Sequence, residues 1–288
     1  MSLTLNWSDH ALNLGQRTHV MGILNVTPDS FSDGGRYLEA DKAVEYALEM
    51  AREGADIIDV GGESTRPYSQ KISVSEELDR IIPVIEVLSK ELTIPISIDT
   101  YKGAVAEESL KAGASIINDI SALRFDPHMA SIAAQAGVPL ILMHMKGTPQ
   151  DMQENPVYDD VISEILDFLK DAIISSRKAG IKESLIIVDP GIGFGKTFDN
   201  NLEIIRDLSR FASLKRPVLL GTSNKAFIGH TLGREAHQRD TGTMATISAG
   251  VMNGAHIVRV HNVRKAVETV KIIDEIKRGR GEKHAILY

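Results

Sequence analysis

PISIDTYKGAVAEESLKAGASIIN, residues 95–118, contains a complete strand, helix and strand. Residues 95–99 and 115–118 are short apolar runs, which are typical of parallel strands covered on both faces. The intervening residues 102–112 place their apolar positions on one helical face, and Gly113 follows as a helix-ending residue. This stretch therefore predicts two parallel strands joined by a crossover helix.

The same alternation extends along the chain in both directions. Strands are predicted at residues 18–25, 56–60, 95–99, 115–118, 138–143, 185–189, 217–221 and 256–260. Amphipathic helices are predicted at residues 41–53, 76–90, 102–112, 161–179, 201–211 and 263–277. About eight such units in roughly 250 residues indicate an α/β fold, a (β/α)₈ TIM barrel. A doubly wound open sheet is the structural alternative.

No linker interrupts this alternation, so we expect a single domain over residues 1–288. Two short apolar runs between Leu3 and Leu14 predict an N-terminal β-hairpin, within residues 1–15, that covers the bottom of the barrel. Ser73 and Glu76 have capping-box spacing. Pro83 predicts either a kink in the second helix or a later helix start.

The composition excludes several classes of protein. The 288 residues include 39 acidic and 32 basic side chains, and the formal charge of −7 argues against a nucleic-acid partner. The absence of cysteine excludes disulfides and thiolate metal sites. The N-terminus does not resemble a signal peptide, and no apolar run approaches the ~20 residues of a membrane helix. We therefore expect a cytoplasmic protein with no membrane partner.

Polar side chains end most of the predicted strands: Asn25, Asp99, Asn118, Asp189, Arg259 and His261. At the C-terminal face of a barrel such side chains converge on one pocket. The alternative is that they cap helices, since Asp and Asn are common N-cap residues. That alternative does not fit arginine or histidine.

These polar groups suit a planar nitrogen heterocycle. A carboxylate accepts two parallel hydrogen bonds from a 2-amino group and an adjacent ring N–H, and Asp189 is the candidate acceptor. Lys225, after the seventh strand, is the candidate donor to the opposite side of the ring. The alternative for Lys225 is a solvated surface lysine.

Arg259 and His261 alternate at a strand end and therefore point to one face, beside a helix that begins near Asn262 with free N–H groups. They predict a diphosphate site, which we expect opposite the carboxylates. Asn25, on the neighbouring first strand, offers an amide oxygen to a Mg²⁺ that is held mainly by substrate phosphates.

Two other readings of the sequence are set aside. PGIGFGKT, residues 190–197, nearly matches a P-loop, but proline replaces the first glycine, which argues against an NTPase. No histidine pair has the spacing of a zinc site.

Two turn-rich loops complete the predicted rim. GILNVTPDSFSDGG, residues 22–35, and GGESTRP, residues 61–67, each begin in or follow a predicted strand. Loops at this position commonly close over substrate. Two ordinary turns are the alternative.

The chain resembles the dihydropteroate synthase family of folate biosynthesis. The first loop and DIIDVGGESTRP (56–67) carry the resemblance, together with SIDT (97–100), IINDI (116–120), LMHMKGTP (142–149), DPGIGFGK (189–196), GTSNKAFIG (221–229) and VRVHNV (258–263). The resemblance implies a transferase that joins 4-aminobenzoate to (7,8-dihydropterin-6-yl)methyl diphosphate, giving 7,8-dihydropteroate and diphosphate. It also implies a homodimer and a sulfonamide target.

The resemblance further implies three sets of contact residues. The pterin would contact Asp99, Asn118, Ile120, Met143, Asp189, Phe194, Gly221, Lys225 and Arg259. The diphosphate, with Mg²⁺ at Asn25, would contact Asn25, Arg259 and His261. The 4-aminobenzoate would contact Phe31, Ser64, Thr65, Arg66, Pro67, Lys225 and Ala226. The implied catalytic residues are Asp33, Asn25, Lys225, Arg259 and His261.

Two features refine this expectation. Asp33 is expected to stabilise the cationic centre once its loop closes. Ser223 to Ala226 reads Ser-Asn-Lys-Ala, whereas the common family pattern is Ser-Arg-Lys-Ser. Because Ala226 lacks the second hydroxyl, we expect weaker binding of aminobenzoate and of sulfonamides.

Three alternative functions share part of the pattern. A pterin-binding methyltransferase has no diphosphate to hold, which Arg259 and His261 argue against. A phosphate-binding barrel isomerase or lyase would need a base or Schiff-base lysine on an inner strand face, whereas Lys225 lies in a loop. A homologue that has lost its activity would have broken loop signatures, and these are intact.

Overall fold

The structure is a computed structural model and describes residues 3–27 and 36–279. Its main sheet has eight parallel strands in the order β8-β7-β6-β5-β4-β3-β10-β9. The strands are β3 (His19–Asn25), β4 (Ile57–Gly61), β5 (Ile96–Asp99), β6 (Ile116–Asp119), β7 (Leu140–Met143), β8 (Ile186–Asp189), β9 (Leu219–Leu220) and β10 (Ile257–Val260). A parallel bridge between Val188 and Val218 joins the two ends of this order. The predicted barrel is therefore confirmed, and the open-sheet alternative is wrong.

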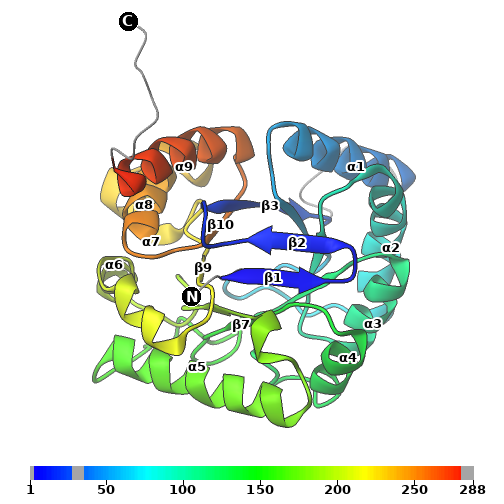
Figure 1. Cartoon of the computed structure of the whole chain (residues 1–288), viewed down its shortest axis with the longest axis horizontal. Coiled ribbons are helices and arrows are strands. Elements are labelled where there is room, and N and C mark those ends of the chain that lie inside the picture. Colours follow the sequence, from blue (N-terminus) through cyan, green and yellow to red (C-terminus); the bar gives the residue numbers. More distant parts are fainter. Residues whose placement is uncertain (1–2, 28–35, 280–288) are drawn as a thin grey trace, which may run out of the picture.

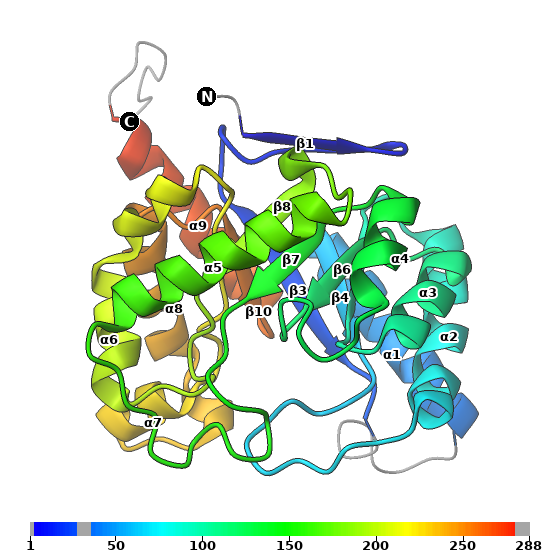
Figure 2. The same ribbon diagram turned by 90° about the horizontal axis from the view of Figure 1, so that it is seen from below.

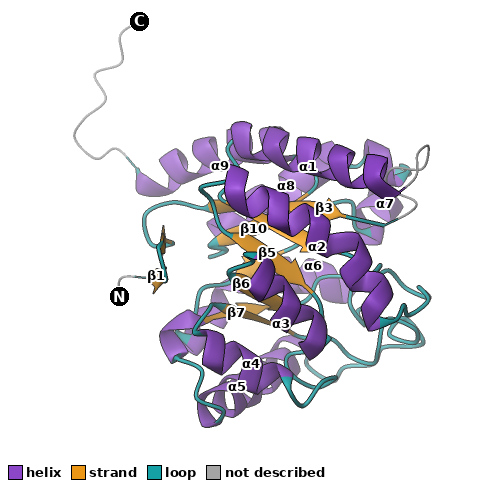
Figure 3. Ribbon diagram, turned by 90° about the vertical axis from the view of Figure 1, so that its right-hand side faces the viewer, coloured by secondary structure: helices purple, strands orange, loops and turns teal. Residues whose placement is uncertain are grey.

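Helices surround the barrel on its outer side (Figures 1 and 3). They are α1 (Arg36–Arg52), α2 (Val74–Glu91), α3 (Gly103–Ala112), α4 (Met129–Ala136), α5 (Val161–Lys178), α6 (Phe198–Arg206), α7 (Ala226–Leu232), α8 (Asp240–Met252) and α9 (Val263–Arg278). Helices α7 and α8 were not predicted, and for α4 only the end at Gly137 was expected, without a residue range. The helix predicted at residues 201–211 is divided into α6 and a 3₁₀ helix over Leu208–Leu214.

The N-terminal hairpin is present as β1 (Thr4–Trp7) and β2 (His10–Asn13), which pair antiparallel. Leu5, Trp7 and Leu12 are buried in the main core. Figure 2 shows the hairpin across one end of the barrel, opposite the loops that follow the strands. It therefore covers the N-terminal end of the strands and leaves the other end free for a site.

Helix α2 does not start late, although a later start was one of the two expectations for Pro83. The helix starts at Val74 and includes Pro83, and the Ser73 hydroxyl accepts a 3.1 Å hydrogen bond from the Glu76 N–H. This side-chain cap satisfies a donor of the first turn and fixes the start of the helix. The expectation of a later start is wrong for that reason.

Two helices end at the glycines expected to end helices. Gly113 and Gly137 are the C-caps of α3 and α4, and both adopt left-handed backbone angles.

No helix in the described ranges is both long enough and apolar enough to span a membrane.

Candidate functional site

The C-terminal end of the barrel gathers four polar side chains into one hydrogen-bonded network. Arg259 on β10 donates from Nε to Asp59 Oδ2 at 2.6 Å and from Nη2 to Asp99 Oδ2 at 2.6 Å. Asn118 on β6 donates from Nδ2 to the same Asp59 oxygen at 3.1 Å. The structure thus brings Asp99, Asn118 and Arg259 together, as predicted, and adds Asp59 on β4.

The charges of this network are closely coupled. Burial would lower the pKa of Arg259, but the carboxylates of Asp59 and Asp99 outweigh it and raise the pKa. Burial also raises the pKa of Asp99, against the opposing charge of Arg259. Two carboxylates therefore share one guanidinium. The expected separation of the anion site from the carboxylates is wrong, because Arg259 is bonded to both of them.

The proposed capping role of Asp99 is also wrong. The N-cap of α3 is Lys102, which makes no side-chain cap, and the Asp99 carboxylate is instead bonded to Arg259. Its second oxygen, Oδ1, is buried and has no hydrogen-bond partner among the residues that the structure describes. A buried unpaired carboxylate oxygen is costly, and a ligand donor or cation would satisfy it.

Asp189 and Lys225 are near enough for their charges to act on each other and on Arg259. Burial raises the pKa of Asp189 to about 6, although the Gly191 N–H and the charge of Lys225 oppose the rise. Burial and the charge of Arg259 lower the pKa of Lys225 to about 8, although Asp189 opposes the fall. The Gly191 N–H donates to Asp189 Oδ1 at 2.7 Å. These values place both groups in their ionised forms near neutral pH.

An apolar cluster separate from the main core includes residues at or just after the ends of β6 and β7. It consists of buried Tyr101, Ile120, Met143, Met145 and Met152, with Phe125 and Phe194 packed against it. The Lys225 ammonium lies 4.1 Å from the centre of the Phe194 ring. Gly193 adopts a φ of +80°, and a Cβ there would lie 3.0 Å from Lys225 Cδ, so glycine gives the lysine its space. Flat apolar surface beside charged groups suits an aromatic heterocycle.

His261, directly after β10, is held by Ser223. The Ser223 hydroxyl oxygen accepts from the His261 backbone N–H at 3.2 Å and lies 2.9 Å from the ring Nδ1. Burial, with the charges of Arg259, Arg66 and Lys225, lowers the pKa of His261 to about 4. The ring is then neutral at pH 7, and the hydroxyl either accepts from Nδ1 or donates to it according to the tautomer. The second tautomer leaves Nε2 as an N–H donor.

The residues around Asn25 fit a magnesium ion that is carried mainly by phosphates. A Cβ at Gly61 would lie 3.9 Å from Asn25 Oδ1 and 3.8 Å from Asp99 Oδ2, so glycine leaves these two oxygens facing one space. Asp99 Oδ1 has no partner. Within the described ranges no three acidic or histidine side chains gather to hold a metal. Mg²⁺ is commonly held by few protein oxygens and takes most of its ligands from phosphate and water.

The start of α9 is less open than expected. The Asn262 side chain caps the helix by accepting from the Lys265 N–H at 3.1 Å. Asn262 Nδ2 and Lys265 Nζ both donate to Asp240 Oδ2, at 2.9 Å each. One N–H group of the first turn is thus already used, and a carboxylate stands beside the helix end.

The second rim loop is anchored at its base. Glu63 accepts from Tyr101 Oη at 2.6 Å and from Lys102 Nζ at 2.5 Å. Farther along, the Tyr68 N–H donates to Pro149 O at 3.0 Å. The loop carries Ser64, Thr65, Arg66 and Pro67, of which Arg66 and Pro67 are exposed. Of these four, Arg66 is near enough for its charge to act on His261.

Four further residues belong to the predicted site. Phe31 and Asp33 lie outside the described residues. Ala226 is the first residue of α7 and is exposed, next to Lys225, which is the N-cap. Gly221 follows β9, and a Cβ there would lie 3.8 Å from Arg259 Cβ.

The glycine-rich segment at 190–197 does not present its lysine to a phosphate. Lys196 is buried, and its ammonium contacts His144 Nδ1 at 3.0 Å, Phe194 O at 3.0 Å and His144 O at 3.3 Å. Burial and the charge of Lys196 lower the pKa of His144 to about 2, so the ring is a neutral acceptor. The lysine therefore joins the loops after β7 and β8.

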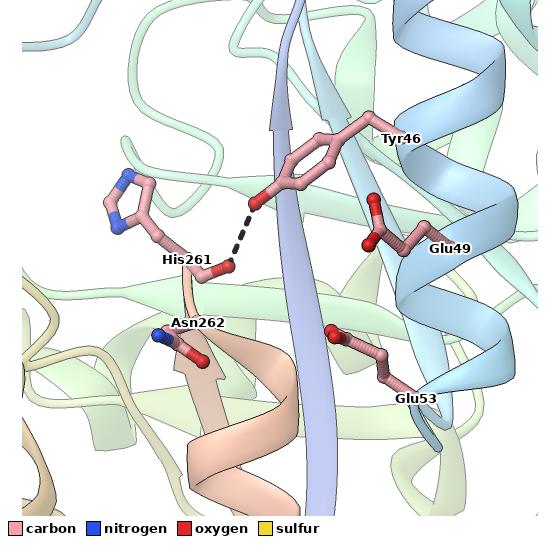
Figure 4. A pocket seen from close by; sticks show the side chains of 5 residues that line it. All are labelled: Tyr46, Glu49, Glu53, His261 and Asn262. Atoms are coloured by element: carbon pink, nitrogen blue, oxygen red, sulfur yellow. Dashed lines mark hydrogen bonds between the residues drawn. The ribbon is translucent and has the colours of Figure 1, made fainter.

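A pocket of ≈ 270 Å³ lies between α1 and the start of α9, lined by Tyr46, Glu49, Glu53, His261 and Asn262 (Figure 4). Tyr46 Oη donates to the His261 carbonyl oxygen at 3.0 Å. The His261 ring points away from the two glutamates in this view. Because the pocket is lined by carboxylates, it does not suit a diphosphate, and its tyrosine holds the His261 backbone.

The sequence analysis missed Asp59, Ser223 and Lys196. A signal existed for Asp59, since a lone carboxylate inside the apolar run Ile57–Gly61 requires a buried partner. The predicted site rests on residues that end strands, and Asp59 lies inside one. No comparable signal marks Ser223, because its partner lies 38 residues away in sequence.

Comparisons with known proteins agree with this geometry. A family model described as "Pterin binding enzyme" matches residues 21–261. A dihydropteroate synthase of Bacillus subtilis is 48% identical over 274 residues, which are 95% of this chain and 94% of that relative.

Two solved structures from Xanthomonas albilineans are also similar. A dihydropteroate synthase with 4-aminobenzoic acid has a TM-score of 0.91 at 42% identity, covering 97% of this chain and 100% of that chain. Another, in complex with 7,8-dihydropteroate, has a TM-score of 0.87 at 40% identity and covers 96% and 100%.

Proposed function

The chain belongs to the dihydropteroate synthase family of pterin binding enzymes, and we propose that the site at the C-terminal end of its barrel carries out that family's reaction. The reaction joins 4-aminobenzoate to (7,8-dihydropterin-6-yl)methyl diphosphate and releases diphosphate. The observation that carries the proposal is the convergence of Asp99, Asn118 and Arg259 in one network. Relatives that hold 4-aminobenzoic acid and 7,8-dihydropteroate support one substrate and the product of this reaction.

The pterin is proposed to lie between the polar network and the apolar cluster. Asp189 accepts from its 2-amino and ring N–H groups, because Oδ2 and the second lone pair of Oδ1 remain available beside the Gly191 bond. Lys225 donates to the acceptor side of the ring. Ile120, Met143, Phe194 and Gly221 provide the flat surface around it, with Asp99, Asn118 and Arg259 at the polar edge.

The diphosphate is proposed to bind Asn25, Arg259 and His261. Arg259 Nη1 donates to no residue in the described part of the chain and is directed to the phosphates in this proposal. The neutral His261 ring donates from Nε2 in the tautomer whose Nδ1 accepts from the Ser223 hydroxyl. Bound Mg²⁺ would be held by Asn25 and the phosphates and would neutralise charge on the leaving group. This charge is needed because Asp59 and Asp99 already face Arg259.

The proposed chemistry starts with the C–O bond at the pterin methylene carbon. Its electron pair leaves with the diphosphate, and the dihydropterin delocalises the positive charge. The neutral aniline nitrogen then forms the C–N bond and loses a proton to solvent. Catalysis thus depends on stabilising the departing anion, through Arg259 and His261, more than on a strong base.

The aminobenzoate is proposed to bind Phe31, Ser64, Thr65, Arg66, Pro67, Lys225 and the Ala226 backbone at the start of α7. Asp33 is proposed to stabilise the cationic centre. For Asp33→Ala we expect a large loss of turnover with little change in pterin affinity, measured by steady-state kinetics and calorimetry. Unchanged turnover would remove Asp33 from the catalytic set.

We also propose that residues 1–288 form one domain, with the hairpin in residues 1–15. The protein is proposed to be a cytoplasmic homodimer. Sulfonamides are proposed to inhibit it. Exposed apolar side chains on the last two helices support a dimer face: Met252, Ile272 and Ile276 are 50%, 64% and 59% exposed. Light scattering gives the mass that tests the dimer.

The experiment that tests the function is calorimetry followed by product analysis. A pterin should bind alone, and aminobenzoate should bind only after pyrophosphate and Mg²⁺ are added. With both substrates the protein should form 7,8-dihydropteroate. Pterin binding without any effect of pyrophosphate would favour a methyltransferase instead.

A further inference from the structure

We propose that Asp59 is a positioning residue, which determines the atoms that Asn118 and Arg259 present to the substrates. The inference rests on the proposed function of the site. Asp59 is not among the residues proposed to contact a substrate. It acts through Asn118 and Arg259, which are.

Asp59 occupies the interior of β4 and is fully buried, with 0% of its surface exposed. Its Oδ2 accepts from Arg259 Nε at 2.6 Å and from Asn118 Nδ2 at 3.1 Å. Its Oδ1 is buried, and no residue of ranges 3–27 and 36–279 pairs with it. An ionised carboxylate accepts hydrogen bonds and cannot donate them. The groups that face Oδ2 are therefore forced to be donors.

This requirement fixes the orientation of the Asn118 amide. With Nδ2 directed to Asp59, Oδ1 lies on the opposite side of the amide carbon as an acceptor. A flip would place two oxygens against each other and lose the hydrogen bond. Asn118 is thereby set to accept an N–H from the pterin rather than to donate.

The same oxygen fixes the guanidinium of Arg259. Nε is bound by Asp59 and Nη2 by Asp99, from two neighbouring strands, so the plane of the group is defined at two points. Nη1 remains for the diphosphate. Because one oxygen orients both Asn118 and Arg259, the pterin and diphosphate sites share a single buried anchor.

The test compares Asp59→Leu with Asp59→Asn. Leucine removes the acceptor, so Asn118 can flip, and we expect the Kd of 6-hydroxymethyl-7,8-dihydropterin to rise about 10- to 100-fold. Asparagine keeps an oxygen that accepts from both donors and should retain most of the affinity. Ser97→Ala is the matched control, since Ser97 pairs with Asp59 in register, is fully buried and has a hydroxyl without a partner.

A second substitution separates orientation from packing. In Asp59→Leu/Asn118→Asp, residue 118 presents an acceptor in either orientation, so pterin affinity should recover relative to Asp59→Leu. If Asp59 serves only to stabilise the fold, the second change will not restore affinity. Thermal unfolding of each variant monitors folding.

A measurement on the unmodified protein covers the case in which Asp59→Leu does not fold. The Asn118 side-chain NH₂ protons should be protected from exchange before pterin binds and should remain so afterwards, because they face Asp59. Exposed protons, or equal pterin affinity in a folded Asp59→Leu variant, would overturn the proposal. Failure of the unmodified protein to bind pterin would instead refute the proposed function.

Discussion

The affinity for a pterin should depend on pH through Asp189. Burial raises the pKa of this carboxyl from 3.8 to about 6. About nine tenths of the group is then ionised at pH 7, and about one tenth at pH 5. The N–H groups of a bound pterin favour the carboxylate, so its pKa is lower in the complex than in the free protein. Affinity is therefore nearly complete above about pH 7, is about half of its maximum near pH 6, and should fall about tenfold between pH 7 and pH 5.

The upper limit comes from Lys225, since its pKa is lowered to about 8 and its charge is lost above that pH. Calorimetry with 6-hydroxymethyl-7,8-dihydropterin from pH 5 to 9 measures both limits. The control is Asp189→Asn, which should bind weakly and show a much flatter response below pH 7. This control is needed because the pKa of Asp99 is raised too. A pH-independent affinity, or the same slope in Asp189→Asn, would refute the reasoning.

Three further variants test other parts of the structure. Ser223→Ala removes the hydroxyl that orients His261, so calorimetry should show a roughly 3- to 10-fold weaker pyrophosphate affinity and an unchanged pterin affinity; an equal pyrophosphate Kd would contradict this role. Ala226→Ser adds a hydroxyl near the aminobenzoate site and should lower the aminobenzoate KM several-fold, a prediction that fails if KM does not change. Leu5→Ala empties a buried position in the hairpin and should lower the free energy of unfolding in urea by about 2 to 4 kcal/mol. Pterin affinity should be unaffected by that change, and a weaker affinity would argue against the separation of the hairpin from the site.

The barrel was predictable from the sequence because parallel strands are covered on both faces. Runs such as residues 115–118 are apolar throughout, and the helix after them returns the chain to the same end. Helix α8 was missed for a related reason. Its sequence, DTGTMATISAGVM, contains many small residues and no clear apolar stripe, so periodicity gives no signal.

The site was only partly predictable. Strand-end positions identified Asp99, Asn118 and Arg259, because the topology alone brings those ends together. The pairing of Arg259 with Asp59 spans 200 residues and depends on which way each side chain leans inside the barrel. The anion site was placed wrongly because side-chain directions inside the barrel cannot be read from the sequence. Charge type alone suggested that cationic and acidic groups would be separated.

The short strand β9 has a consequence for how the protein responds to its substrate. Strands β8 and β9 meet through the bridge at Val188 and Val218, with Leu219 and Leu220 as the whole of β9. Strands β8 and β9 are joined by a single bridge, whereas the other neighbouring strands pair at two or more positions. Asp189 ends β8, and Lys225 follows β9. A ligand that contacts both Asp189 and Lys225 would link strand β8 to the loop that follows β9. The backbone amides of these two strands should therefore exchange their hydrogens more slowly when the ligand is bound.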